Sequence, residues 1–284
     1  MATEVLPVAP EHVEKLGDIC YRAFHGIASS HGFPTDFTSP QMASMIIGSM
    51  VRSEQSYCIA AASDGALAGS NFLTTNDEVG AVGPVSVAPD LQGRGIGRLL
   101  MQNLLDYARD AGIERVRLMQ DSFNMQSLAL YASFGFDTRA PCALMIPAPQ
   151  PSGDVRLATK GDLDAIEALS RDIYRVSRRN EAEQHIGGPM PPHVCEKAGR
   201  IIAYFIPGMV GHGAGETEEA LVETVLASVV DMLPEMQRVF CPLIEGDLYR
   251  RLLAAGCANR KVMNLMSLGP YEAPAGPWLP SVGF

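Results

Sequence analysis

Three glycines at alternate positions mark the segment of this chain whose residue types and spacing best suit ligand chemistry. Gly93, Gly95 and Gly97 follow an apolar strand that ends at Pro89, and an apolar-periodic helix begins directly after them. Glycine lets the backbone approach a ligand without hindrance from a Cβ atom. Backbone N–H groups at a helix start have no acceptor within the helix and carry roughly half a positive charge from the helix dipole. The segment from Gly93 to Arg98 is therefore predicted to bind an anion such as a pyrophosphate.

The glycine pattern differs from two common nucleotide-binding motifs. A P-loop ends in Gly-Lys-Ser or Gly-Lys-Thr, whereas this turn ends in Gly97-Arg98-Leu99. A dinucleotide fingerprint needs a third glycine, and here that position is Arg98 or Leu100, depending on the starting glycine. On the pattern alone, a glycine-rich turn that binds no ligand remains an alternative.

The same region resembles the GNAT superfamily of acyl-CoA-dependent N-acetyltransferases. The segment Gln92-Gly93-Arg94-Gly95-Ile96-Gly97 is similar to the Q/R-x-x-G-x-G/A motif of that family. Asn124 and the segment 130–136 are similar to its closing N…LY…GF motif, and the strands at 85–87 and 116–120 resemble its fourth and fifth strands. The resemblance implies an α/β structure, the GNAT fold with a mixed central sheet, and acetyl-CoA or a related acyl-CoA as co-substrate.

The resemblance also assigns roles in binding coenzyme A. The strand at 85–87 would hold the pantetheine arm through its backbone, and the glycine turn would hold the pyrophosphate. Asn124 either contacts the cofactor or caps the helix that follows it, and the two arginines of the turn either reach a phosphate or are solvated charges. The residues assigned to acyl-CoA binding are Val85, Ser86, Val87, Gln92, Gly93, Arg94, Gly95, Ile96, Gly97, Arg98 and Asn124.

Acyl transfer from a thioester to an amine needs a proton for the departing thiolate and an acceptor for the proton of the amine. Tyr131 holds the family's position for the general acid, and its alternative role is a ring packed in the core. Glu78 is the first candidate for the general base and Asp121 the second, and each is alternatively an exposed turn carboxylate. His25 and His31 either line the acceptor site or are simply exposed. No clustered ligand set is found in the sequence, so no metal is predicted.

The elements that must position these residues occur twice along the chain. The proline-rich segment 147–153 is predicted to be a linker. On each side of it, a short strand leads into an amphipathic helix, and the second opening lies 150 residues after the first. This similarity predicts a tandem duplication, with a catalytic domain at 1–148 and a degenerate GNAT-like domain at 154–284.

The hydrophobic periodicity and the turn residues predict the elements of the first half. Ser39 and Pro40 are a favourable cap and first residue of a helix. The expected elements are helices at 11–23, 40–50, 96–111 and 125–134, a loop at 26–38, and strands at 57–61, 68–73, 81–87, 116–120 and 142–146.

The second half lacks the residues that carry the predicted chemistry. The segment 206–219 contains glycines but no Q-x-x-G-x-G motif, and acidic residues begin the helix that follows it. Leu252 stands opposite Tyr131 when the two halves are aligned. This half is therefore predicted to be non-catalytic. Its tail, 269–284, contains Trp278, the only tryptophan, and is expected to dock on a domain or across a homodimer.

Composition excludes several classes of protein. The chain of 284 residues is 47% hydrophobic, which supports a folded core, and its net charge of −10 disfavours nucleic acid and anionic membranes as partners. The six cysteines form no CxxC pair, which favours reduced thiols, and no signal peptide or membrane span is found in the sequence. We expect a cytoplasmic protein.

The sequence as a whole predicts an acetyltransferase. It would move an acetyl or other acyl group from acetyl-CoA to a primary amine of a small molecule or peptide by direct attack on the thioester. The acidic charge mildly favours a cationic amine. The alternative is a non-catalytic acyl-CoA-binding sensor or regulatory protein, which would bind the coenzyme without turnover.

Overall fold

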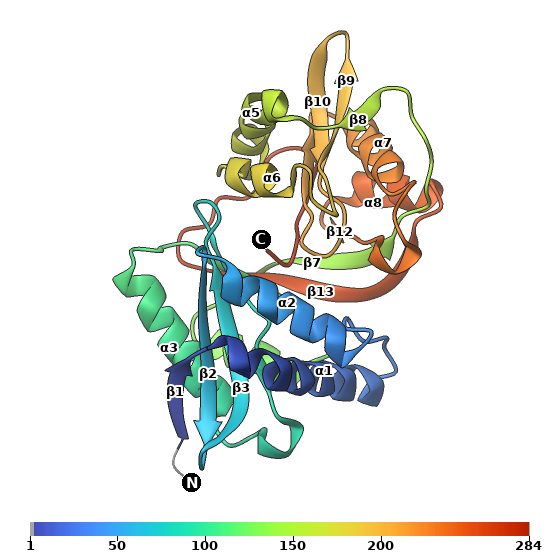
Figure 1. Cartoon of the computed structure of the whole chain (residues 1–284). Helices are drawn as coiled ribbons and strands as arrows, with labels where there is room; N and C mark the ends of the chain where they lie inside the picture. Colours follow the sequence, from blue (N-terminus) through green and yellow to red (C-terminus); the bar gives the residue numbers. More distant parts are fainter. Residues whose placement is uncertain (1–2, 284) are drawn as a thin grey trace. The chain divides into compact units, whose positions relative to one another are not determined.

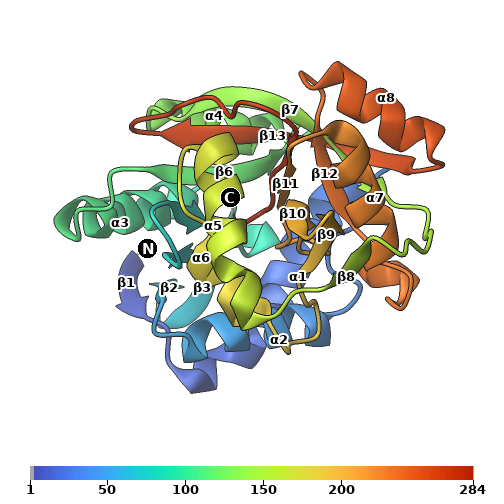
Figure 2. The same cartoon turned by 90° about the horizontal axis from the view of Figure 1, so that it is seen from above.

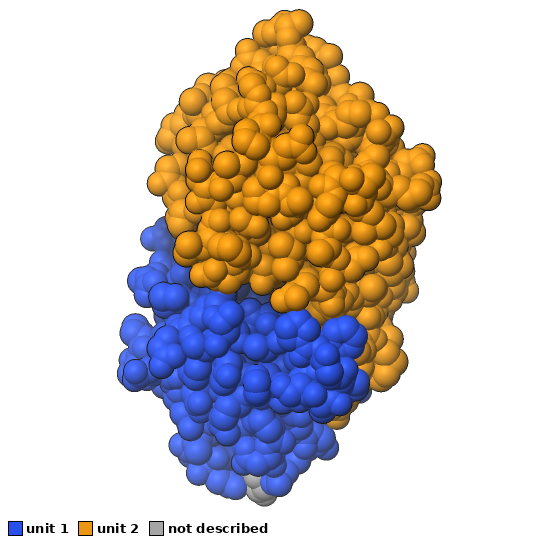
Figure 3. All heavy atoms as spheres, turned by 90° about the vertical axis from the view of Figure 1, so that its right-hand side faces the viewer, with its two compact units in different colours: residues 1–75, 80–116 blue, residues 76–79, 117–284 orange. Residues whose placement is uncertain are grey.

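The computed structural model describes residues 3–283, and the chain packs as two compact units. Unit 1 comprises residues 1–75 and 80–116, and unit 2 comprises residues 76–79 and 117–284; Figure 3 colours them separately. The predicted domains 1–148 and 154–284 follow the repeat in the sequence rather than the packing, and they remain a prediction.

Unit 1 is built on an antiparallel sheet. Its elements are β1 (Thr3–Pro7), α1 (Val13–Ser30), α2 (Pro40–Arg52), β2 (Ser56–Ser63), β3 (Ala66–Thr74), β4 (Gly80–Val82), β5 (Ser86–Val87) and α3 (Ile96–Asp110). The strand order is β1-β2-β3-β4, and β5 also pairs with β3. Figure 1 labels β1, β2 and β3. The predicted strand at 81–87 is therefore two short strands, because Pro84 between them has no N–H to donate to a ladder.

Helices cover both faces of this sheet. Phe72 of β3 is fully buried in a cluster with Leu16 of α1 and Ile47 of α2. The amide of the preceding residue, Asn71, contacts the sulfur of Met101 in α3. Since neighbouring side chains of a strand point to opposite faces, α1 and α2 cover one face and α3 covers the other.

The ends of the first two helices compare directly with their predicted limits. Ser39 caps α2 as predicted, because its hydroxyl accepts a hydrogen bond from the amide of Met42 at 3.1 Å. In contrast, α1 continues to Ser30 instead of ending at residue 23, so the predicted loop at 26–38 begins only at His31. Ala28, in this last part of the helix, is buried.

Unit 2 contains two sheets. Its elements are β6 (Val116–Asp121, beginning with the last residue of unit 1), α4 (Met125–Ser133), β7 (Asp137–Ile146), β8 (Val155–Leu157), α5 (Leu163–Tyr174), α6 (Arg179–His185), β9 (His193–Lys197), β10 (Arg200–Phe205), β11 (Gly213–Gly215), α7 (Glu218–Ser228), β12 (Val239–Pro242), α8 (Gly246–Ala254), β13 (Ala258–Leu268) and β14 (Trp278–Leu279). One sheet has the order β6-β13-β7-β12, and the other has the order β14-β11-β10-β9-β8.

Strand order in unit 2 departs from chain order. Strand β13, from the second half of the sequence, pairs antiparallel with β7 along 137–146 and lies between β7 and β6. Strand β12 pairs with the other edge of β7. Because β7 has partners on both edges, it extends over ten residues, beyond the predicted strand at 142–146.

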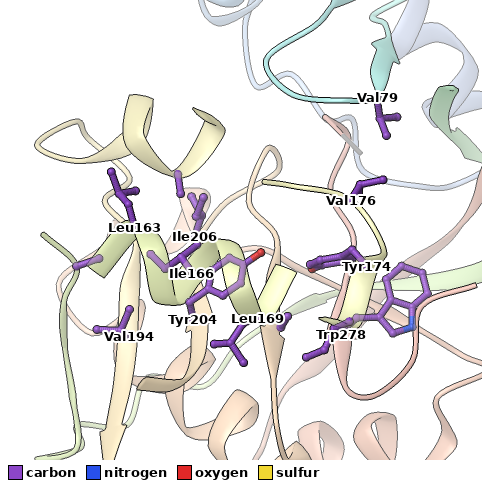
Figure 4. Close-up of a cluster of buried hydrophobic side chains, with 14 of the residues drawn as sticks. Val79, Leu163, Ile166, Leu169, Tyr174, Val176, Val194, Tyr204, Ile206 and Trp278 are labelled. Carbon is purple, nitrogen blue, oxygen red and sulfur yellow. The ribbon is translucent and has the colours of Figure 1, made fainter. Parts of the chain in front are cut away.

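Two large apolar clusters lie in the second half, beside smaller ones. One lies around α5 and includes Ile166, Tyr174, Tyr204 and Trp278, and Figure 4 shows part of it. The other lies around α7 and α8, which pack against each other (Figure 2), and includes Leu252. Among the described residues, no helix has the length and apolar content needed to cross a bilayer.

Candidate functional site

The glycine turn in unit 1 has the backbone conformation that its composition predicts. Gly93 and Gly95 have φ angles of +76° and +85°, in the left-handed region that favours glycine. A Cβ atom at either position would meet no other described atom within 4 Å, so the turn faces open space. The side-chain amide of Gln92 donates to the carbonyl of Val87 at 3.1 Å and ties the turn to the end of β5.

The turn leads directly into the start of α3. Gly95 is the cap residue and has no side chain, and the first turn of the helix, Ile96-Gly97-Arg98, contains no acidic residue. The first helical hydrogen bond at this end is from the amide of Leu99 to the carbonyl of Gly95 at 3.0 Å. The first amides of an α-helix have no acceptors within the helix, so a start of this kind offers the donors and the dipole that an anion requires.

Strand β5 has a sheet partner on one edge. Ser86 and Val87 pair with Ser70 and Gly69 of β3, and within residues 3–283 no other strand pairs with β5. Ser86 is buried and its hydroxyl lies 3.3 Å from that of Ser70, whereas Val85 and Val87 are half-buried. The structure thus brings 85–87 and 92–98 together in unit 1.

The remaining predicted site residues, Glu78, Asn124 and Tyr131, belong to unit 2. Tyr131 lies on α4 and is buried, with its ring centroid 6.1 Å from that of Phe136. Burial, reinforced by the negative charge of Asp121, raises the pKa of Tyr131 above its ordinary value of 10. The phenol therefore stays protonated at neutral pH, as a proton donor must.

Asn124 caps α4. Its side-chain oxygen accepts a hydrogen bond from the amide of Ser127 at 3.1 Å, and its carbonyl accepts one from the side chain of Gln120 at 2.7 Å. The capping alternative is therefore realised, and a contact between Asn124 and the coenzyme stays a prediction.

Both candidate bases carry ion pairs. Glu78 lies 2.9 Å from the guanidinium of Arg171 on α5 and accepts a hydrogen bond from the amide of Ser177 at 3.4 Å. Asp121 lies 2.6 Å from the ammonium of Lys261 on β13. Sequence analysis missed Lys261, because nothing in the local pattern indicates that β13 lies beside β6.

Contrary to the sequence prediction, the two histidines do not lie together in one loop. His25 lies in α1 and stacks on the ring of Tyr21, with the centroids 5.4 Å apart. His31 follows the helix, and its Nδ1 lies 2.9 Å from the carbonyl of Ile27. Within the described part of the chain, no group of three or more His, Cys, Asp or Glu side chains is arranged to hold a metal ion.

The corresponding helix of the second half, α7, begins in a different way. The hydroxyl of Thr217 accepts a hydrogen bond from the amide of Ala220 at 3.2 Å, and the acidic residues of the first turn, Glu218 and Glu219, pair with Arg251 at 3.4 and 2.6 Å. Side chains of the protein itself thus complement the donors and the dipole at this helix start. That the second half is degenerate and non-catalytic stays a prediction.

The C-terminal tail docks on unit 2 of its own chain. Strand β14 pairs with β11 through Trp278 and Leu279, and both residues are fully buried. The indole N–H of Trp278 donates to Glu245 at 3.1 Å, and the hydroxyl of Tyr174 donates to the carbonyl of Leu279 at 2.7 Å. Strand β11, the last strand before α7, therefore has partners on both edges, unlike β5 before α3.

Comparison with known proteins places these features in a family. Residues 24–136 match the acetyltransferase (GNAT) family. The mycothiol acetyltransferase of Thermomonospora curvata is 39% identical over 89 residues, which cover 31% of this chain and 30% of that protein. The matches to the first curated relatives cover less than a third of their own lengths.

Solved structures resemble the whole chain. An acetyltransferase from Pyrococcus horikoshii superimposes with a TM-score of 0.76 at 15% identity, covering 94% of this chain and 89% of that one. A tandem GNAT protein from the clavulanic acid biosynthesis pathway superimposes with a TM-score of 0.61 at 14% identity, covering 97% and 99%. Residues 24–136 therefore match the acetyltransferase (GNAT) family, and the chain as a whole has the α/β fold of a tandem GNAT protein, with a mixed sheet.

Proposed function

We propose that this protein transfers an acetyl group from acetyl-CoA to a primary amine. The observation that carries the proposal is the start of α3, where a glycine turn with two positive φ angles opens onto helix amides that no side chain of the cap residue can satisfy. This segment lies inside the region that matches the GNAT family.

The residues of unit 1 would hold the donor substrate. The amides of 93–98 would donate to the pyrophosphate of acetyl-CoA, because they combine hydrogen-bond donors with the positive end of the α3 dipole. The backbone N–H and C=O groups of Val85 and Val87 would form hydrogen bonds with the pantetheine amides. These bonds would run along the edge of β5 with which no other described strand pairs.

The proposed reaction is a direct attack. The neutral amine nitrogen bonds to the thioester carbonyl carbon, the carbon–sulfur bond breaks, and Tyr131 gives its proton to the departing sulfur. The products are an amide and coenzyme A. Tyr131 is proposed for this step because it holds the family's position for the general acid and its buried phenol is protonated at neutral pH.

The proton released by the amine needs an acceptor, and Glu78 stays the proposed base. Its carboxylate is already engaged by the guanidinium of Arg171 at 2.9 Å and by the amide of Ser177 at 3.4 Å. This existing ion pair is the observation that favours the alternative function, an acyl-CoA sensor without turnover.

The acceptor is proposed to be a small-molecule or peptide amine. The net charge of −10 favours an amine on a cationic molecule, because a negative protein attracts it over long range.

Two measurements on the full chain test the proposal. Calorimetric titration with acetyl-CoA should show binding, and release of free thiol should then rise above the hydrolysis rate with at least one member of a panel of primary amines. Binding with no amine-dependent thiol release would favour the sensor. Absence of binding would refute both functions.

A further inference from the structure

Strand β13 brings side chains from the second half of the sequence to the end of β6, close to α4. It lies between β6 and β7 in the same sheet, and the carbonyl of Val262 accepts hydrogen bonds from both the amide and the hydroxyl of Ser122 at 3.2 and 2.7 Å. Residues some 140 positions apart are thus held in a fixed register beside the segment that leads to Tyr131.

A buried ion pair forms at this junction. The ammonium of Lys261 lies 2.6 Å from the carboxylate of Asp121, and the two side chains are only 2% and 9% exposed. The same ammonium lies 5.8 Å from the centre of the Phe123 ring. Removing one partner of such a pair leaves an uncompensated buried charge, which is strongly unfavourable.

A second link runs from β13 to the first turn of α4. The side-chain amide of Asn264 donates to the side-chain oxygen of Gln120 at 2.9 Å. The amide nitrogen of Gln120 in turn donates to the carbonyl of Asn124 and to the hydroxyl of Ser127, at 2.7 and 3.0 Å. Asn264 therefore orients the group that fixes the capped end of the helix on which Tyr131 lies.

We propose that Lys261 and Asn264 are positioning residues for the proton donor Tyr131, so that the second half of the chain completes the catalytic apparatus of the first. The inference rests on the proposed acyltransferase function. When Tyr131 gives its proton to the thiolate, a phenolate forms, and the negative charge of Asp121 opposes it. Lys261 neutralises that charge, while Asn264 holds α4 through Gln120.

The test compares charge variants of the full chain under saturating substrates. Lys261→Met removes the ammonium but keeps the length of the side chain, and we expect kcat to fall about tenfold or more, a part of the 10²- to 10⁴-fold that a positioned proton donor supplies. The KM for acetyl-CoA should not change. Lys261→Arg, and the double variant Asp121→Asn/Lys261→Met, should recover most of kcat, because neither leaves an unpaired carboxylate.

Two further variants separate positioning from general stability. Lys197→Met, at the end of β9, breaks the pairs of this lysine with Glu223 and Asp154 and should leave kcat unchanged. Asn264→Ala should lower kcat without changing the KM for acetyl-CoA, and it tests the inference even where Lys261→Met fails to fold.

The outcomes separate this inference from the function on which it rests. A wild-type protein that releases no thiol with any amine refutes the proposed function and this inference with it. An active wild type whose kcat is unaffected by Lys261→Met and by Asn264→Ala, or whose double variant stays as impaired as the single one, refutes the inference alone.

Discussion

Placing a negative charge at the start of α3 should abolish tight binding of acetyl-CoA. Gly95→Asp puts a carboxylate into the open space above the helix amides, where it both caps those amides and repels a phosphate. If the new carboxylate and one phosphate charge of acetyl-CoA are about 4 to 5 Å apart, their repulsion at an effective dielectric constant of about 20 is roughly 3 to 4 kcal/mol. This repulsion raises the Kd for acetyl-CoA by about 100-fold or more.

Gly112→Asp is a matched control at the other end of the same helix. Gly112 also has a positive φ, +71°, and a Cβ atom there would likewise meet no described atom within 4 Å. A non-glycine residue in this conformation costs roughly 1 to 2 kcal/mol at either position, so both variants carry similar backbone strain. At Gly95 the new cap offsets about 1 kcal/mol of that strain.

Calorimetric titration of the wild type and both variants, with the melting temperature measured alongside, decides the matter. We expect weak or undetectable binding for Gly95→Asp only. Wild-type affinity in Gly95→Asp would refute the assignment of the pyrophosphate to this turn. An equal loss in Gly112→Asp would show that strain, rather than charge at the binding amides, causes the effect.

Three other perturbations have defined outcomes. Tyr131→Phe keeps the packed ring but removes the proton donor, so kcat should fall by about 10²-fold or more while acetyl-CoA binding measured by calorimetry stays the same; full turnover would remove the assignment. Trp278→Ala should lower the free energy of unfolding by about 3 to 5 kcal/mol, measured by circular dichroism in urea, because the fully buried side chain leaves a cavity; a loss below about 1 kcal/mol would show that β14 is not part of the core. Hydrogen bonds from Arg156 hold the pKa of Asp162 below its ordinary value of 3.8, so the stability that this group adds is present above that value and is lost as the pH falls below it. Asp162→Asn should therefore make the free energy of unfolding depend less on pH between about 5 and 2. An unchanged pH dependence would contradict the lowered pKa of Asp162.

Features that depend on neighbours in the sequence were predictable. The glycine turn needs positive φ angles at Gly93 and Gly95, and only the local backbone decides that. The cap at Ser39 is a hydrogen bond between residues three apart, and the same is true of the cap at Asn124. The missing tyrosine at Leu252 was visible from alignment of the two halves, and the structure places that leucine in the core.

Only the tertiary structure decided which distant segments meet. The apolar residues of 262–266 are typical of a strand, but they do not say which strand pairs with it, because many pairings satisfy the same pattern. The insertion of β13 beside β6, the pair between Lys261 and Asp121, and the docking of Trp278 beside β11 all join residues more than 60 positions apart in the chain. Their free energy comes from burial and from hydrogen bonds that exist only once the whole unit has packed, so no local window of the sequence contains them.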